Sequence, residues 1–142
     1  MTTNTATVDL DISAAPAQVW EALTDPEVIR KYFFGAEVAS TWQPGSPITW
    51  SGEYDGRSYQ DKGEVLECVP EQRLRLTHFS PLSGQEDKPE NYHQLTYELS
   101  DEGDHTHLRF EQDNNPTPEA LAESQKNWVV VMNGLKECVE RG

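Results

Sequence analysis

Apolar residues near the end of the chain recur at the spacing of an α-helix. At about 100° per residue, four of them fall within roughly 40° of Leu121 around the helix axis: Trp128, Met132, Leu135 and Val139. Thr117 is a good N-cap, and Pro118 suits the first helical position. The pattern predicts one helix over residues 118–141, roughly 36 Å long. Such a helix needs a broad apolar surface to lie on.

The first part of the chain predicts a strand followed by two short helices. Residues 7–13 alternate between apolar and polar side chains, as a half-buried strand does. The segment that starts at residues 14–16 has the apolar side of a short helix, formed by Val19, Trp20 and Leu23. Asp25 and Pro26 are typical of the N-cap and the first position of a second helix, which Gly35 ends.

Between residues 36 and 112 the apolar period changes to two, which predicts six further strands. These strands cover residues 36–42, 48–54, 58–69, 73–79, 93–99 and 106–112. Asp55–Gly56 is a strong hairpin signal, and Gly63 indicates a bulge or a bend. Residues 80–91 are expected to form a long loop, either a lid over one end of a cavity between sheet and helix or a mobile solvated loop.

An antiparallel sheet of these strands needs a cover on one face, and the C-terminal helix supplies it. The expected fold class is therefore α+β: seven strands, two short helices after the first strand, and a long C-terminal helix. A length of 142 residues indicates a single domain over residues 1–142.

Composition narrows the classes of function. The net charge of −14 repels phosphate backbones and anionic lipid, so we expect neither nucleic-acid nor membrane binding. The longest apolar run, residues 128–132, is too short to span a bilayer, and residues 1–6 lack the features of a signal peptide. Cys68 and Cys138 are expected to be reduced thiols. Together these features predict a cytoplasmic protein.

Several strings in the chain carry a family resemblance. They are APAQVWEALTDP at 15–26, GEVLE at 63–67, TYEL at 96–99, THLRF at 106–110 and NW at 127–128. With this order of elements, the chain resembles the SRPBCC (START-like, helix-grip) superfamily, and within it the Hsp90 ATPase activator homologue family. The resemblance implies a seven-stranded antiparallel sheet that wraps the C-terminal helix and leaves a cavity. It also implies a link to the stress response.

The resemblance suggests three functions. Members commonly bind small apolar or lipid-like molecules in the cavity, which is the function we expect here. Some relatives are enzymes, so a cyclase or hydrolase acting in the same cavity is an alternative. The eukaryotic cochaperones stimulate Hsp90, so an interaction module with a chaperone partner is the third. We expect no cofactor, and the chain could be a monomer or a homodimer.

Residues on the inner face of the predicted helices and strands are the candidates for a ligand site, because apolar walls with a few polar groups favour binding. The expected site residues are Trp20, Phe33, Trp50, His78, Tyr97, Phe110, Gln112, Gln125, Trp128 and Met132. Trp128 and Met132 are the first candidates, and residues 33–35 are the expected lip of the cavity.

Histidines are the candidates for chemistry. His78 shares strand parity with Leu74 and Leu76 and is the best-placed acid or base. No Ser-His-Asp or Cys-His arrangement is readable, so no catalytic residue is assigned. His105 and His107 lie near acidic residues, but strand alternation turns both toward solvent, and no metal site is expected.

Overall fold

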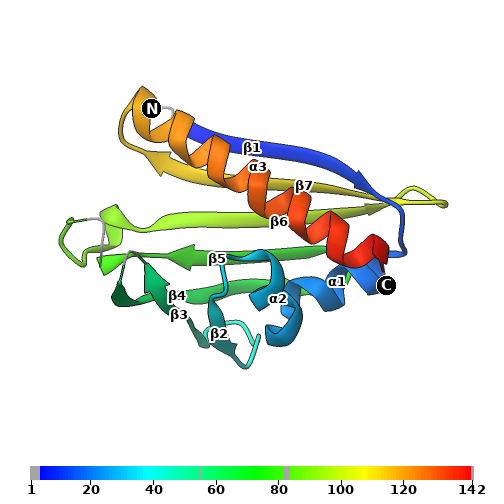
Figure 1. Ribbon diagram of the computed structural model, residues 1–142, viewed down its shortest axis with the longest axis horizontal. Helices are drawn as coiled ribbons and strands as arrows, with labels where there is room; N and C mark the ends of the chain where they lie inside the picture. Colours follow the sequence, from blue (N-terminus) through cyan, green and yellow to red (C-terminus); the bar gives the residue numbers. More distant parts are fainter. Residues whose placement is uncertain (1–3, 55, 82–83, 142) are drawn as a thin grey trace.

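The computed structural model describes residues 4–54, 56–81 and 84–141, and it confirms the α+β fold (Figure 1). The strands within these residues are β1 (Asn4–Ile12), β2 (Glu37–Ser40), β3 (Pro47–Tyr54), β4 (Arg57–Val69), β5 (Arg73–His78), β6 (His93–Asp101) and β7 (Thr106–Asn115). The helices are α1 (Pro16–Thr24), α2 (Pro26–Tyr32) and α3 (Pro118–Arg141), with a 3₁₀ turn, η2 (Pro89–Asn91), before β6. None of the helices in the described part of the chain combines the length and apolar character that crossing a bilayer needs.

The strands form one antiparallel sheet in the order β1-β7-β6-β5-β4-β3-β2. Figure 1 shows α3 crossing over β1 and β7, while α1 and α2 lie beside its C-terminal end. One face of the sheet is therefore covered by helices, and it carries the apolar members of the alternating strands. We call this covered face the inner face.

The long helix has the bounds that its sequence pattern predicts. Thr117 caps it, because its hydroxyl oxygen accepts a hydrogen bond from the Ala120 N–H at 3.0 Å. The residues that α3 buries are Trp128, Val131, Met132 and Leu135. Three of these belong to the predicted apolar stripe, and Val131 extends the stripe toward α2.

Side chains of α3 also bond to the main chain of β1, an edge strand. Gln125 accepts a hydrogen bond from the Thr7 N–H at 3.0 Å and donates one to the Thr7 carbonyl at 2.6 Å. Nearer the end of the helix, Glu140 accepts a hydrogen bond from the Ser13 N–H at 2.8 Å. These contacts satisfy main-chain groups that an edge strand cannot pair within the sheet.

Gly63 lies directly against the main chain of β5. A Cβ atom at this position would be 1.8 Å from the Thr77 carbonyl oxygen, so only glycine fits. The sequence predicts a bulge or a bend at Gly63, and the register shift with β5 lies just beyond it, between Val65 and Glu67. The glycine is needed for close approach of two strands rather than for a bulge.

The ends of two elements differ from those that the sequence pattern predicts. The predicted strand over residues 36–42 stops at Ser40, because Trp42 has φ +62°, outside the range of a strand. The second short helix begins as predicted, with Asp25 accepting a hydrogen bond from the Glu27 N–H at 3.0 Å. It ends at Tyr32, before Gly35.

Candidate ligand site between the sheet and the helices

A cavity of ≈ 20 Å³ lies between the sheet and the two short helices. Its walls are Leu23, Ile29, Tyr32, Phe33, Val38, Trp42, Ile48, Trp50, Leu74, Leu76 and Tyr97. A space of this size holds about one water molecule. Side chains therefore nearly fill the interior in this conformation, and a larger guest has to displace some of them.

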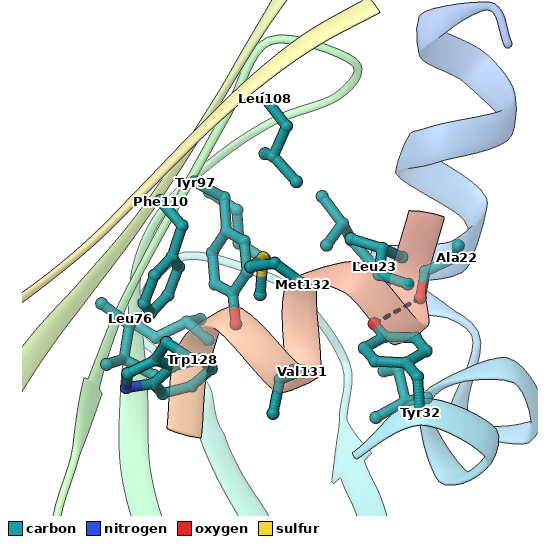
Figure 2. Close-up of a cluster of buried hydrophobic side chains, with 14 of the residues drawn as sticks. Ala22, Leu23, Tyr32, Leu76, Tyr97, Leu108, Phe110, Trp128, Val131 and Met132 are labelled. Carbon is teal, nitrogen blue, oxygen red and sulfur yellow. Dashed lines mark hydrogen bonds between the residues drawn. The ribbon is translucent and has the colours of Figure 1, made fainter. Parts of the chain in front are cut away.

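The Tyr97 hydroxyl is one polar group in the walls of this cavity. The residue is only 7% exposed, and its hydroxyl has no hydrogen-bond partner within the described residues. Figure 2 shows the ring standing off the sheet, with its oxygen directed toward the turn of α3 between Trp128 and Val131. Burial raises the pKa of this phenol, so it stays protonated. By contrast, the Tyr32 hydroxyl donates to the Ala22 carbonyl at 2.8 Å.

Aromatic side chains close the cavity at the connections before and after β2. Phe33 packs its ring edge against Trp128, with ring centres 5.6 Å apart, whereas Phe34 is 65% exposed. Phe34 has φ +52° and Trp42 has φ +62°, which is an unfavourable conformation for bulky residues. Gly35 follows with φ +74°. At the position of the predicted lip, Phe33 lines the cavity and Phe34 is exposed.

A carboxylate–imidazole pair lies on the inner face beside the cavity. His78 Nε2 is 2.8 Å from Asp61 Oδ2, and the two side chains are 21% and 15% exposed. Trp50, a wall of the cavity, meets the His78 ring edge to face at 4.9 Å, and the His93 ring stacks on the other side at 6.1 Å. Asp61 Oδ1 is buried and has no partner among the described residues.

His93 is held by the main chain of β7. Its Nδ1 lies 3.0 Å from the Asp113 carbonyl, which can only accept, so Nδ1 carries the proton. The Gln112 amide nitrogen, 3.2 Å from the same Nδ1, then faces a donor and adds no hydrogen bond. Burial lowers the pKa of His93, which keeps the ring neutral at pH 7.

Gln112 joins α3 to the sheet through its side chain. The Trp128 indole N–H donates to the Gln112 carbonyl oxygen. The amide nitrogen donates to Asn115 Oδ1 at 3.3 Å, and the Ser124 hydroxyl donates to the same oxygen at 2.6 Å. A buried amide with these partners fixes the helix on the sheet and has little capacity left for a ligand.

Sequence comparison places this geometry in a family. Residues 13–140 match the family described as Activator of Hsp90 ATPase homolog 1-like protein. The chain belongs to this family. No curated protein sequence matches it.

Solved structures resemble this Activator of Hsp90 ATPase homolog 1-like chain over almost its whole length. The solution structure of ChR145 from Cytophaga hutchinsonii has 40% identity and a TM-score of 0.87, covering 99% of this chain and 97% of that one. The crystal structure of MLL2253 from Mesorhizobium loti has 23% identity and a TM-score of 0.81, covering 96% and 97%. The solution structure of the Aha1 dimer from Colwellia psychrerythraea has 20% identity and a TM-score of 0.75, covering 96% of both chains. The last two likenesses concern the fold alone.

The ten predicted site residues lie in several different environments. Three line the cavity: Phe33, Trp50 and Tyr97. Four are packed in the core: Phe110, Gln112, Trp128 and Met132. The other three are His78 in its pair with Asp61, Gln125 bonded to β1, and Trp20, which packs half-buried against the core.

Trp128 and Met132 thus differ from the prediction that α3 lines the cavity. The cavity walls given above contain no residue of α3. The helix lies over β1 and β7, where its apolar stripe meets Phe110 directly, with the Trp128 and Phe110 ring centres 4.1 Å apart. The free space is further along the sheet, between the two short helices and the inner face of β2, β3, β5 and β6.

Two residues near the cavity were not predicted. Asp61 had a signal in the sequence, because it shares strand parity with Val65, which is buried on the inner face. Trp42 had none, since it was assigned to a strand and lies instead in a left-handed turn.

The open grooves on the surface of the described residues include two that are much larger than the cavity. One of ≈ 700 Å³ lies between the short helices and the end of α3, lined by Gln18, Glu21, Ala22, Val28, Lys31, Cys138, Val139 and Arg141. The other, of ≈ 500 Å³, lies on the outer face of the sheet. Its Arg73 is 3.2 Å from Glu98 and 3.5 Å from Glu67, so these charges compensate one another. Neither groove brings together a buried polar group and apolar walls.

His105 and His107 pair with carboxylates on the outer side of the sheet. His107 Nδ1 is 2.8 Å from Asp11 and its Nε2 is 3.0 Å from Asp9, while His105 Nδ1 is 2.7 Å from Asp104. Over the residues that the structure describes, no group of three or more His, Cys, Asp or Glu side chains could hold a metal ion. The hydrogen bonds to the carboxylates raise the pKa of both histidines.

This pairing predicts a small pH dependence of stability. The pKa of His107 is raised above its unfolded value of about 6.5, so its stabilisation is complete below that pH and is lost as pH rises through the folded pKa. The advantage of the wild type over His107→Gln should therefore shrink between about pH 6 and pH 9, by less than about 1 kcal/mol because the pair is exposed. Urea unfolding at several pH values measures it, and a constant difference contradicts it. The lowered pKa of His93 contributes to the pH dependence of stability with the opposite sign, but it does so in both proteins and cancels in their difference.

Proposed function

We propose that this family member binds a small, mostly apolar molecule between the sheet and the helices. The observation that carries the proposal is the Tyr97 hydroxyl, which belongs to a 7% exposed residue lining an apolar cavity and has no hydrogen bond to the described residues. Leaving such a group unpaired costs about 1–3 kcal/mol. A ligand with one polar group would restore the missing hydrogen bond while its apolar body fills the space between the aromatic walls.

Binding includes an opening of the lip, because a cavity of ≈ 20 Å³ is too small for an organic molecule. Phe33 and Trp42 are the half-buried walls, and each is next to or in a left-handed turn. Strained backbone of this kind is held in place by its surroundings and releases energy when it moves. An outward movement of Phe33 about Gly35 would enlarge the cavity without unpacking the sheet.

The experiment measures thermal stability with two probes of one shape, naphthalene and 2-naphthol, on the wild type and on Tyr97→Phe. A ligand that binds only the folded state raises the melting temperature. We expect both probes to raise that of the wild type, by about 3 °C or more when well above their dissociation constants. 2-Naphthol should raise the melting temperature of the wild type more than naphthalene does, and this difference between the probes should vanish in Tyr97→Phe.

The matched control is Tyr32→Phe. This substitution removes a hydroxyl that donates to the Ala22 carbonyl, so we expect a loss of about 1–2 kcal/mol in unfolding free energy. Tyr97→Phe should change stability by less than about 0.5 kcal/mol or raise it, since no hydrogen bond is lost. The proposal would be contradicted if neither probe shifted the melting temperature of the wild type. It would also be contradicted if Tyr97→Phe and Tyr32→Phe lost the same amount of unfolding free energy.

A second candidate is an enzyme of cyclase or hydrolase type, which the Asp61–His78 pair favours. A carboxylate that holds an imidazole in place is a common general-base unit. Here, however, Asp61 engages Nε2, the nitrogen at the far end of the ring. The remaining Nδ1 is the ring nitrogen nearer the main chain of β5. The arrangement therefore supports binding better than it supports proton transfer.

A further inference from the structure

One oxygen of Asp61 is unsatisfied. Oδ2 is bonded to His78, whereas Oδ1 is closed off from solvent and has no donor among the described residues. Burying a carboxylate oxygen without a hydrogen bond is unfavourable, so the position calls for a donor from outside the chain. Within the described residues, no Lys or Arg lies within ion-pair distance of this carboxylate, and the only partner is the His78 ring.

Two aromatic residues are neighbours of Asp61 on the same face of the sheet. Trp50 is the direct cross-strand neighbour of Asp61 and is 4% exposed. Tyr59 lies two residues earlier on the same face of β4, over Gly52, where an added Cβ would be 2.9 Å from the phenol oxygen. Burial and then the charge of Asp61 raise the pKa of Tyr59, which places this ring beside the carboxylate. Aromatic rings next to a carboxylate are surroundings that favour a cation.

Three kinds of donor could reach Oδ1: a water, a hydroxyl and a protonated amine. The amine fits the surroundings best. It donates to the carboxylate with charge assistance, its charge interacts with the ring faces, and the net charge of −14 raises its local concentration. We propose that Asp61 anchors a protonated amine on the apolar ligand, with Trp50 as the wall shared by the anchor and the cavity. This inference rests on the proposed function and gives its ligand a chemical class.

The amine site also has a side chain that can open it. The hydroxyl of Tyr59 has no hydrogen-bond partner in the described ranges, and the residue is half-buried. Rotation of this ring away from Gly52 leaves the hydrogen bonds of the sheet intact. Trp50, by contrast, is fixed between the core and the His78 ring. We therefore assign Tyr59 as the cover of the amine site.

The test uses three probes with one indole body and different head groups: tryptamine, tryptophol and indole-3-propionate. Dissociation constants are measured by calorimetry on the wild-type chain in about 0.5 M salt, where a Debye length of roughly 4 Å suppresses the general field of the protein. Tryptamine should bind at least about tenfold more tightly than tryptophol, as one charge-assisted hydrogen bond allows. Indole-3-propionate should bind most weakly.

Two variants locate the effect. Asp61→Asn keeps the shape of the side chain, and it should reduce the preference for tryptamine over tryptophol to about onefold. Glu64→Gln is the matched control, because it removes the same charge from an exposed position on the same strand, and the preference should survive there. Amide spectra of both variants establish that each is folded.

The outcomes separate this inference from the proposed function. Equal binding of tryptamine and tryptophol to the wild type, or a tryptamine preference that persists in Asp61→Asn, overturns the amine anchor. Equal binding of the two probes would mean that a water or a hydroxyl is the donor to Oδ1. A preference that persists in the variant would mean that the amine binds elsewhere on the acidic surface. Stabilisation by naphthalene and 2-naphthol would then still support the apolar site. Failure of every probe in both experiments overturns both proposals.

Discussion

Replacing Gly63 by alanine should destabilise the fold by about 4 kcal/mol or more. The added Cβ would lie 1.8 Å from the Thr77 carbonyl oxygen, far inside van der Waals contact. The strands cannot simply separate, because Lys62 and Phe79 bond to each other through both of their main-chain groups, at 3.0 and 2.7 Å. Urea unfolding followed by circular dichroism measures the loss of free energy.

The matched control for this substitution is Gly52→Ala on the neighbouring strand. A Cβ there would meet only the Tyr59 side chain, 2.9 Å from its hydroxyl oxygen, and that ring can rotate. We expect a loss of less than about 1.5 kcal/mol. Similar losses in the two variants would mean that the contact of β4 with β5 adjusts easily, against the rigid approach described here.

Trp128→Ala should cost about 3–5 kcal/mol of unfolding free energy. The indole packs against Phe110 at 4.1 Å and against Phe33 at 5.6 Å between ring centres, and its N–H donates to Gln112. Truncation therefore leaves both a large hole and a buried amide oxygen without its donor. Thermal and urea unfolding measure the loss.

Val130→Ala, two residues further along the same helix, is the control for helix propensity. Val130 is 54% exposed, so we expect a change within about 0.5 kcal/mol. If Trp128→Ala lost no more than this control, the helix would not depend on its indole for docking. The closure of the inner face would then rest on the smaller apolar residues of the stripe.

Regular alternation made most of the fold predictable. Burial at Val8 and Ile12, or at Leu108 and Phe110, repeats every second residue because strand side chains alternate between two faces. The stripe of α3 follows from the same logic at helical spacing. Sequence patterns of this kind identify the face of each element but not its neighbour.

The site was predicted less well for that reason. Parity placed Tyr97 and Trp50 on the inner face, but whether a side chain borders free space or another side chain depends on how the layers fit. Trp128 faces inward as predicted, yet it meets Phe110 and leaves no gap. Trp42 could not be found from its neighbours, because its left-handed backbone follows from tertiary packing rather than from a local signal.

The hydrogen bonds between α3 and β1 also bear on when the protein can fold during its synthesis. Thr7 and Gln125 are separated by 118 positions, so at roughly 5–20 residues per second a ribosome makes the strand on the order of 10 s before the helix that covers it. During that interval the nascent sheet lacks its cover, and β1 remains open to pairing with other nascent chains. Folding can finish only after α3 has left the exit tunnel, and the mutual repulsion of strongly acidic chains helps to keep them apart until then.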